Sequence, residues 1–230
     1  MANERRAPLG TAASARFVPG LVLAFAGPPA VAAASLALSP SAAATTANLL
    51  GQLALWLVAA GLLAITRFVE RLPLASIGLR PPTGSSVLAG ALAAFVLLYA
   101  ATPIGSWLVG SLGFADLGAG LARLRDLPRP VLVAAAVTAG AVEELLYRGY
   151  AIERLATLTG STTLGAAIAL AAFTLAHWPF WGAGAALFTL VPGAVLTALY
   201  VWKRDLGANV LAHAATAMVQ LLGVATTPSG

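Results

Sequence analysis

Three long stretches of this chain contain no Asp, Glu, Lys or Arg: residues 17–66, 81–115 and 155–202. A helix crosses the hydrocarbon core of a bilayer with about 20 apolar residues. The first and third stretches are therefore long enough for two spans each, divided at the proline-containing segments 39–41 and 177–179. Charged residues are 9% of the chain and the mean hydropathy is +0.89, whereas about a quarter of an average soluble domain is charged. A soluble enzyme and a disordered chain are excluded, and an integral membrane protein is predicted.

These stretches and two further apolar segments predict an all-α, polytopic membrane protein, a bundle of about seven transmembrane helices. The expected spans are residues 17–38, 45–66, 85–112, 130–154, 163–177, 183–202 and 205–224. The chain has no cysteine, so disulfides, cysteine catalysis and Cys-ligated zinc are excluded.

Lys and Arg residues lie mainly on one predicted side of the membrane. That side has Arg5, Arg6, Arg16, Arg67, Arg71, Arg80, Lys203 and Arg204, whereas the other has Arg123, Arg125 and Arg129. Cytoplasmic loops carry the excess of Lys and Arg, so we expect a cytoplasmic N-terminus. The Ala- and Gly-rich composition indicates a bacterial protein of the inner (plasma) membrane. The net charge of +5 is small and scattered, and no nucleic-acid partner is expected.

Four ionisable residues fall inside predicted spans: Glu143, Glu144, His177 and His213. Such residues are costly in a membrane and are functional candidates by default. Adjacent helical residues point about 100° apart, so the two glutamates need different partners. Glu144 lies four residues before Arg148, the favourable order for a helical ion pair. This pairing leaves Glu143, one turn from Tyr147, to face a cavity.

The depth of each residue follows from the rise of about 1.5 Å per helical residue. Counted from the ends of the expected spans, Glu143 and His213 lie at similar depths. His177 comes out about 10 Å deeper on the same count, unless its helix begins outside the membrane core or tilts strongly. The estimate therefore favours Glu143 with His213 and leaves His177 open.

Three short motifs on three predicted spans contain these residues. They are Glu143-Glu144-x-x-x-Arg148, Phe173-x-x-x-His177 and His213-x-x-x-Ala217. In their order, spacing and placement the chain resembles the CPBP intramembrane proteases, the Abi group that includes the type II CAAX prenyl endopeptidases. The third motif departs from the family pattern, because Ala217 stands where the family has Asn or Asp.

The resemblance implies a division of the chain and a role for each motif residue. The division is a cytoplasmic N-terminal segment (1–16), two N-terminal transmembrane helices (17–74), a CPBP-like protease core (75–225) and a tail (226–230). By resemblance, Glu143 is the general base, helped by His177, and His213 stabilises the oxyanion. Asn209, one turn before His213, is our first candidate for the missing amide, followed by Thr216 and Gln220. The supporting residues are Glu144, Arg148 and Phe173.

The function implied is an intramembrane endopeptidase that hydrolyses a peptide bond near a membrane-embedded or C-terminal segment. Its expected partners are the lipid bilayer and a protein or peptide substrate with a hydrophobic segment, and no cofactor is expected. In a bacterium, removal of a bacteriocin leader or of a C-terminal sorting signal fits better than CAAX processing. One alternative is a zinc enzyme with Glu143, His177 and His213 as ligands and an open fourth position. Others are a proton-coupled small transporter and a non-catalytic membrane partner.

Overall fold

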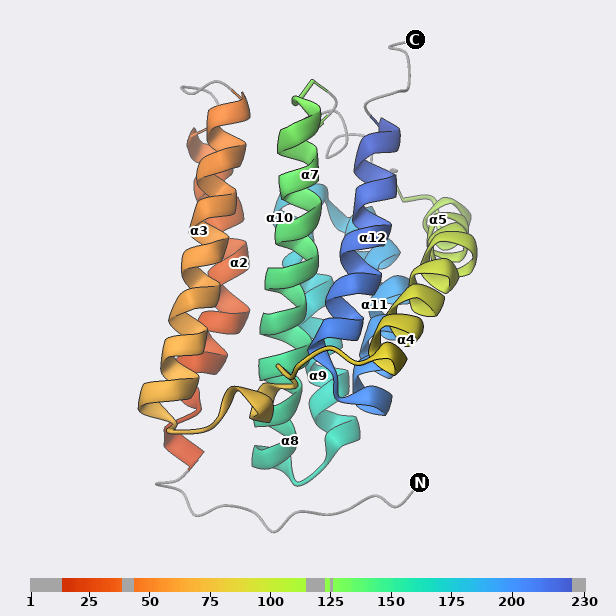
Figure 1. The fold of residues 1–230 in the computed structure, drawn as a ribbon. Helices are drawn as coiled ribbons and strands as arrows, with labels where there is room; N and C mark the ends of the chain where they lie inside the picture. The colour runs from red at the N-terminus through yellow and green to blue at the C-terminus, as the bar shows by residue number, and fades with distance from the viewer. Residues whose placement is uncertain (1–13, 39–43, 115–122, 125, 225–230) are drawn as a thin grey trace.

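The computed structural model describes residues 14–38, 44–114, 123–124 and 126–224. In these residues no strand is present, and seven helices are long and apolar enough to cross a membrane (Figure 1). The first spans are Val18–Leu38 (α2), Ala44–Ala64 (α3) continued by Ile65–Val69 (η1), and Gly84–Val96 (α4), Leu97–Ala101 (η3) and Thr102–Ser111 (α5). The others are Arg129–Thr138 (α7), Ala139–Ile152 (η4) and Glu153–Thr159 (α8), then Thr162–Ala176 (α9), Ala183–Lys203 (α11) and Leu206–Val224 (α12).

The predicted all-α membrane bundle is therefore confirmed, and its spans agree with the expected ranges to within a few residues. Large apolar side chains such as Leu57 and Trp107 are exposed on the outward faces, as lipid contact requires. The break predicted at 39–41, the tail and residues 1–13 of the predicted N-terminal segment lie outside the described residues.

Prolines account for two irregular points in the helices. Pro103 lies in the first turn of α5, and because it has no backbone N–H, one hydrogen bond of a regular helix is lost there. The span passes from α4 to α5 through the π-helical turn η3. Pro179 lies in the first turn of the short helix Trp178–Trp181 (α10), which follows the end of α9. The break predicted at 177–179 is confirmed.

The π-helix η4 lies at the centre of the bundle, between the α2–α3 hairpin and α12 (Figure 1). Most of its side chains are buried, and two glycines allow its neighbours to approach closely. A Cβ at Gly140 would lie 2.7 Å from the backbone N of Ala214 in α12, and one at Gly149 would lie 2.7 Å from the carbonyl O of Ile77. Close packing of η4 thus fixes the level and rotation of the first motif against the third.

One end of the bundle carries most of the basic side chains, and we call it the arginine-rich end. It lies where α2 begins, at the bottom of Figure 1, and its described Lys and Arg residues are Arg16, Arg67, Arg71, Arg80, Arg154, Lys203 and Arg204. Two of them form ion pairs there: Arg154 with Glu70 at 2.7 Å and Arg204 with Glu153 at 2.8 Å. At the opposite end, the described residues include Arg123, Asp126 and Arg129.

Candidate active site

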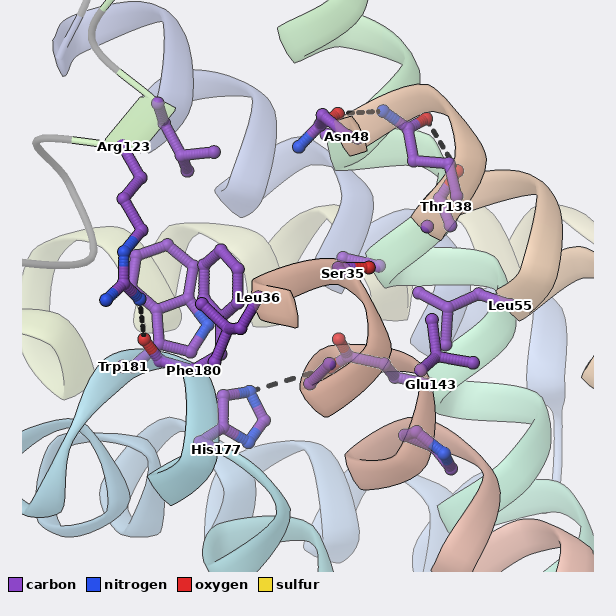
Figure 2. Close-up of a pocket in the computed structure, with 18 of the residues that line it drawn as sticks. Ser35, Leu36, Asn48, Leu55, Arg123, Thr138, Glu143, His177, Phe180 and Trp181 are labelled. Atoms are coloured by element: carbon purple, nitrogen blue, oxygen red, sulfur yellow. Dashed lines mark hydrogen bonds and ion pairs between the residues drawn. The ribbon is translucent and has the colours of Figure 1, made fainter. Parts of the chain in front are cut away.

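A cavity of about 330 Å³ lies beside the first motif. Its walls come from α2, α3, the α7–η4 span and the α9–α10 turn, and Figure 2 shows the side chains that line it. Most of the lining is apolar, with a few polar groups, which is the usual character of a ligand site. The polar and charged lining residues are Ser35, Asn48, Gln52, Arg123, Thr138, Glu143, Tyr147 and His177.

Glu143 and His177 meet at this cavity, as Figure 2 shows. The Glu143 Oε2 and His177 Nε2 atoms are 3.8 Å apart, and the side chains are 20% and 17% exposed. This separation is too long for a direct hydrogen bond, and the buried Oε2 atom has no hydrogen-bond partner. The predicted position of Glu143, facing a cavity, is confirmed.

The backbone orients the imidazole ring of His177. Its Nδ1 atom lies 2.8 Å from the carbonyl O of Phe173, one turn earlier in α9. A carbonyl oxygen only accepts hydrogen bonds, so Nδ1 carries the hydrogen. In the neutral ring, Nε2 then presents its lone pair toward Glu143. The Phe173 ring also packs edge-on against the imidazole, with centroids 4.6 Å apart.

Glu144 points the other way, into a largely buried polar group behind the cavity. Its Oε1 atom accepts from Arg148 at 2.7 Å and from His213 Nδ1 at 2.8 Å, and its Oε2 atom accepts from Asn209 at 3.0 Å. Arg148 also donates to the carbonyl O of Gly193 at 3.1 Å, and its guanidinium lies 4.0 Å from the centroid of the Phe173 ring. We call Glu144, Arg148, Asn209 and His213 the buried ion group. The predicted ion pair of Glu144 with Arg148 is confirmed.

These motifs lie in a part of the chain that matches a known family. Residues 125–219 match the family described as Type II CAAX prenyl endopeptidase Rce1-like. This segment resembles the Rce1-like family. The resemblance predicted from the three motifs is confirmed, and the family indicates a protease in the membrane. Comparison with curated proteins and with solved structures finds no match.

The Rce1-like segment supplies only part of the cavity. Glu143, Tyr147 and His177 belong to it, whereas α2 and α3, which form one wall, precede it. That wall contains Ser35 and Asn48. The catalytic candidates and much of the surface around them thus come from different parts of the chain.

The depth estimate is correct for His213, which bonds the residue next to Glu143, and wrong for His177, which lies at the level of Glu143. Glu143 lies against His177, whereas His213 bonds Glu144 and is not among the residues that line the cavity. The physical reason is the level at which each helix begins. The α8–α9 turn lies beyond the start of α12 at the arginine-rich end (Figure 1), so counting from the start of α9 overestimates the depth of His177.

The three ligands of the zinc alternative are not gathered at one point. Among the described residues, no group of three or more His, Cys, Asp and Glu side chains is placed to hold a metal ion. Glu143 and His177 face the cavity, and His213 is held by Glu144. This arrangement does not fit a His₂Glu site, and we derive no step through a metal.

The three candidate donors for the missing amide have other partners. The Asn209 Nδ2 group donates to Glu144 and, at 2.8 Å, to the carbonyl O of Leu196, which uses both of its hydrogens. Thr216 donates to the carbonyl O of Ala212 and Gln220 donates to Thr102. The expectation that Asn209 offers a free donor to an oxyanion is therefore not met, because Leu196 of α11 and Glu144 already take both of its hydrogens.

Tyr147 is a candidate that the motifs do not include. It lines the cavity, its ring is buried between Phe25 and Phe173, and its hydroxyl has no hydrogen-bond partner. A buried hydroxyl without a partner is costly, which makes Tyr147 a candidate donor to a group that enters the cavity. Its position four residues after Glu143 is the signal in the sequence that points to it.

Proposed function

We propose that this protein is an intramembrane endopeptidase in which Glu143 activates a water molecule for attack on a peptide bond. The observation that carries the proposal is the Glu143–His177 pair: two side chains whose nearest polar atoms are 3.8 Å apart and which both line a largely apolar cavity. A base in a dry, apolar site acts without competition from bulk water, and an apolar cavity suits a hydrophobic peptide segment.

The attacking water binds on the cavity side of these two side chains. It donates one hydrogen to the Glu143 carboxylate and the other to the Nε2 lone pair of neutral His177, so that an oxygen lone pair points toward the substrate. As the new C–O bond forms, Glu143 takes one proton from the water. The carbonyl π electrons move to the carbonyl oxygen and produce a tetrahedral oxyanion. Such general-base help contributes about 10²–10⁴ in rate.

The oxyanion needs a hydrogen-bond donor within the cavity, and Tyr147 has a free one. When the intermediate collapses, the C–N bond breaks and the leaving nitrogen takes the proton that Glu143 received from water. The carboxylate of Glu143 is then ready for another cycle. His213 does not face the cavity, and we assign it with Asn209 to the support of Glu144 and hence of η4.

A transporter would need ionisable groups along a path through the bundle. The buried ionisable groups of the described residues lie at two levels instead, around the first motif and at the arginine-rich end. No observation favours transport, and we propose the protease alone.

The direct test is a cleavage assay with purified protein in proteoliposomes. Its probe is a library of fluorogenic peptides, each with a varied octapeptide followed by an apolar span. We expect cleavage by the wild type and by Asp126→Asn, an acid-to-amide change at an exposed residue outside the cavity. Glu143→Gln should be inactive. A wild type that cleaves no library member would contradict the proposal.

The role of Glu143 as a base rather than a nucleophile has a separate test. In a single turnover in H₂¹⁸O, a general base puts the label directly into the new carboxyl group of the product. A covalent acyl intermediate on Glu143 that water cleaves at the Glu143 carboxyl carbon would release product with unlabelled oxygen in the first turnover and leave the label on the enzyme. Mass spectrometry of product and enzyme separates the two mechanisms.

A further inference from the structure

The two ends of the bundle differ strongly in basic residues. The arginine-rich end holds the start of α2, the connection from α3 to α4 and the turn between α11 and α12. In the sequence, nine of the 13 Lys and Arg residues lie before α2, in these connections, at the end of α11 or in α8, and three lie before or at the start of α7. Cytoplasmic loops carry such an excess of Lys and Arg, so the arginine-rich end belongs on the cytoplasmic side.

The cavity lies in the other half of the molecule. Its lining includes Ser35 near the end of α2, Ala44 at the start of α3 and Leu221 near the end of α12, all far along the bundle from the arginine-rich end (Figure 1). Arg123, which precedes α7, and Trp181, which ends α10, close one side of it, as Figure 2 shows. None of the lining residues belongs to the arginine-rich end.

Polar groups continue along one wall of the cavity away from Glu143. Gln52 donates to Asn48 at 2.6 Å and accepts from Thr138 at 3.2 Å, and Trp56 donates to Thr138 at 3.0 Å. Figure 2 shows this polar row above Glu143, toward the end of the bundle where α3 begins. An unwound peptide in a membrane needs partners for its N–H and C=O groups, and the amide of Asn48 lies where it can supply one.

We propose that the cavity admits its substrate from the non-cytoplasmic face of the membrane. This proposal rests on the proposed protease function and names its substrate class: an exported protein whose hydrophobic anchor carries the scissile bond in the outer half of the bilayer. The peptide enters between the α2–α3 hairpin and α7. It passes the polar row of Asn48, Gln52 and Thr138 and then reaches Glu143 and His177. A cytoplasmic C-terminus with a prenyl group approaches from the wrong side.

The absence of cysteine from the chain permits a clean test by single-cysteine labelling. Ala44→Cys and Ser35→Cys place a thiol in the cavity wall, and Ser85→Cys places one at the exposed start of α4, toward the arginine-rich end. A membrane-impermeant maleimide is added to right-side-out and to inverted membrane vesicles. We expect both cavity thiols to react in right-side-out vesicles, and Ser85→Cys only in inverted ones.

The opposite pattern would overturn the proposal. So would cavity thiols that react only after the membrane is dissolved in detergent, because the cavity would then be closed to the outer face. Labelling does not depend on activity, so this result stands even if the protein is not a protease.

A second experiment tests, by cleavage in cells, from which side the substrate reaches the site. Two single-span substrates carry the same scissile segment, one with it on the non-cytoplasmic side and one inverted. We expect only the first to be cut, and we expect maleimide on Ala44→Cys to block that cleavage. Cutting of the inverted substrate alone contradicts the entry side. If neither substrate nor any library peptide is cut, the protease function fails, and the labelling alone decides which face the cavity opens to.

Discussion

Glu143 and Glu144 are neighbours in the sequence, yet their surroundings are opposite. Glu143 is partly exposed to a cavity, and one of its oxygens is buried without a hydrogen-bond partner. Glu144 is fully buried and accepts hydrogen bonds from Arg148, His213 and Asn209. A carboxylate that already accepts hydrogen bonds from three partners is fixed in position, and little of its acceptor capacity remains for a substrate. One with a free oxygen beside an apolar cavity is available for chemistry, and the predictions below test this division.

The largest effect is expected for Glu143→Gln. The amide keeps the volume and loses the basicity, so cleavage should fall by about 10²–10⁴ or more. The melting temperature should stay close to that of the wild type, because Glu143 makes no direct hydrogen bond to His177. Cleavage kinetics test the predicted loss of activity, and thermal unfolding in the same detergent tests the predicted unchanged stability. A Glu143→Gln protein that cleaves normally would remove the base from the mechanism.

Arg148→Ala should mainly affect stability. It leaves the buried Glu144 carboxylate without its cation and the Gly193 carbonyl without a donor, and breaking such a pair costs roughly 3–5 kcal/mol. Thermal unfolding should show the loss, with activity falling in parallel. Arg129→Ala removes an exposed arginine at the start of α7 and serves as the control. Lost activity with an unchanged melting curve would place Arg148 in the chemistry.

Tyr147→Phe removes a hydroxyl that has no partner in the structure. Turnover should fall by about 10²–10³, the usual loss for an oxyanion donor, while stability should stay constant or rise. Tyr150→Phe is the matched control, because its hydroxyl donates to the buried Glu70. That variant should lose stability and keep its turnover per folded molecule. If Tyr147→Phe cleaves at the wild-type rate, the oxyanion donor must be sought elsewhere.

Asn209→Ala gives a smaller and different effect. Glu144 Oε2 and the Leu196 carbonyl each lose a donor, and leaving buried acceptors unpaired costs about 1–3 kcal/mol. The melting temperature should fall, while the turnover and Michaelis constant of the folded enzyme change little. A loss of about 10²–10³ in turnover at unchanged stability, restored by Ala217→Asn, would instead make Asn209 the oxyanion donor.

The smallest effect is expected from a chelator. Dialysis against EDTA should leave the cleavage rate unchanged, because the possible ligands are split between the cavity and the buried ion group. Loss of cleavage that zinc restores would show that the two groups come together in the active protein.

The membrane helices and the Glu144–Arg148 pair follow from composition and local spacing alone. Long charge-free stretches required membrane helices, since no other arrangement buries so many apolar residues without charges to cover them. The i,i+4 spacing determined the pair of Glu144 with Arg148, because a helix brings these positions together whatever surrounds it. Adjacent residues of a helix point about 100° apart, and this rotation predicted that Glu143 points away from the Glu144–Arg148 pair and toward a cavity.

Packing between distant helices sets which histidine meets which glutamate. Glu143 meets His177, and Glu144 meets His213 and Asn209, because the levels and rotations of η4, α9 and α12 bring them together. Those levels depend on close packing at sites such as Gly140 and on where α9 begins, and no local pattern encodes them. The same holds for the cavity wall of α2 and α3 and for the free hydroxyl of Tyr147: each results from contacts between residues far apart in the chain.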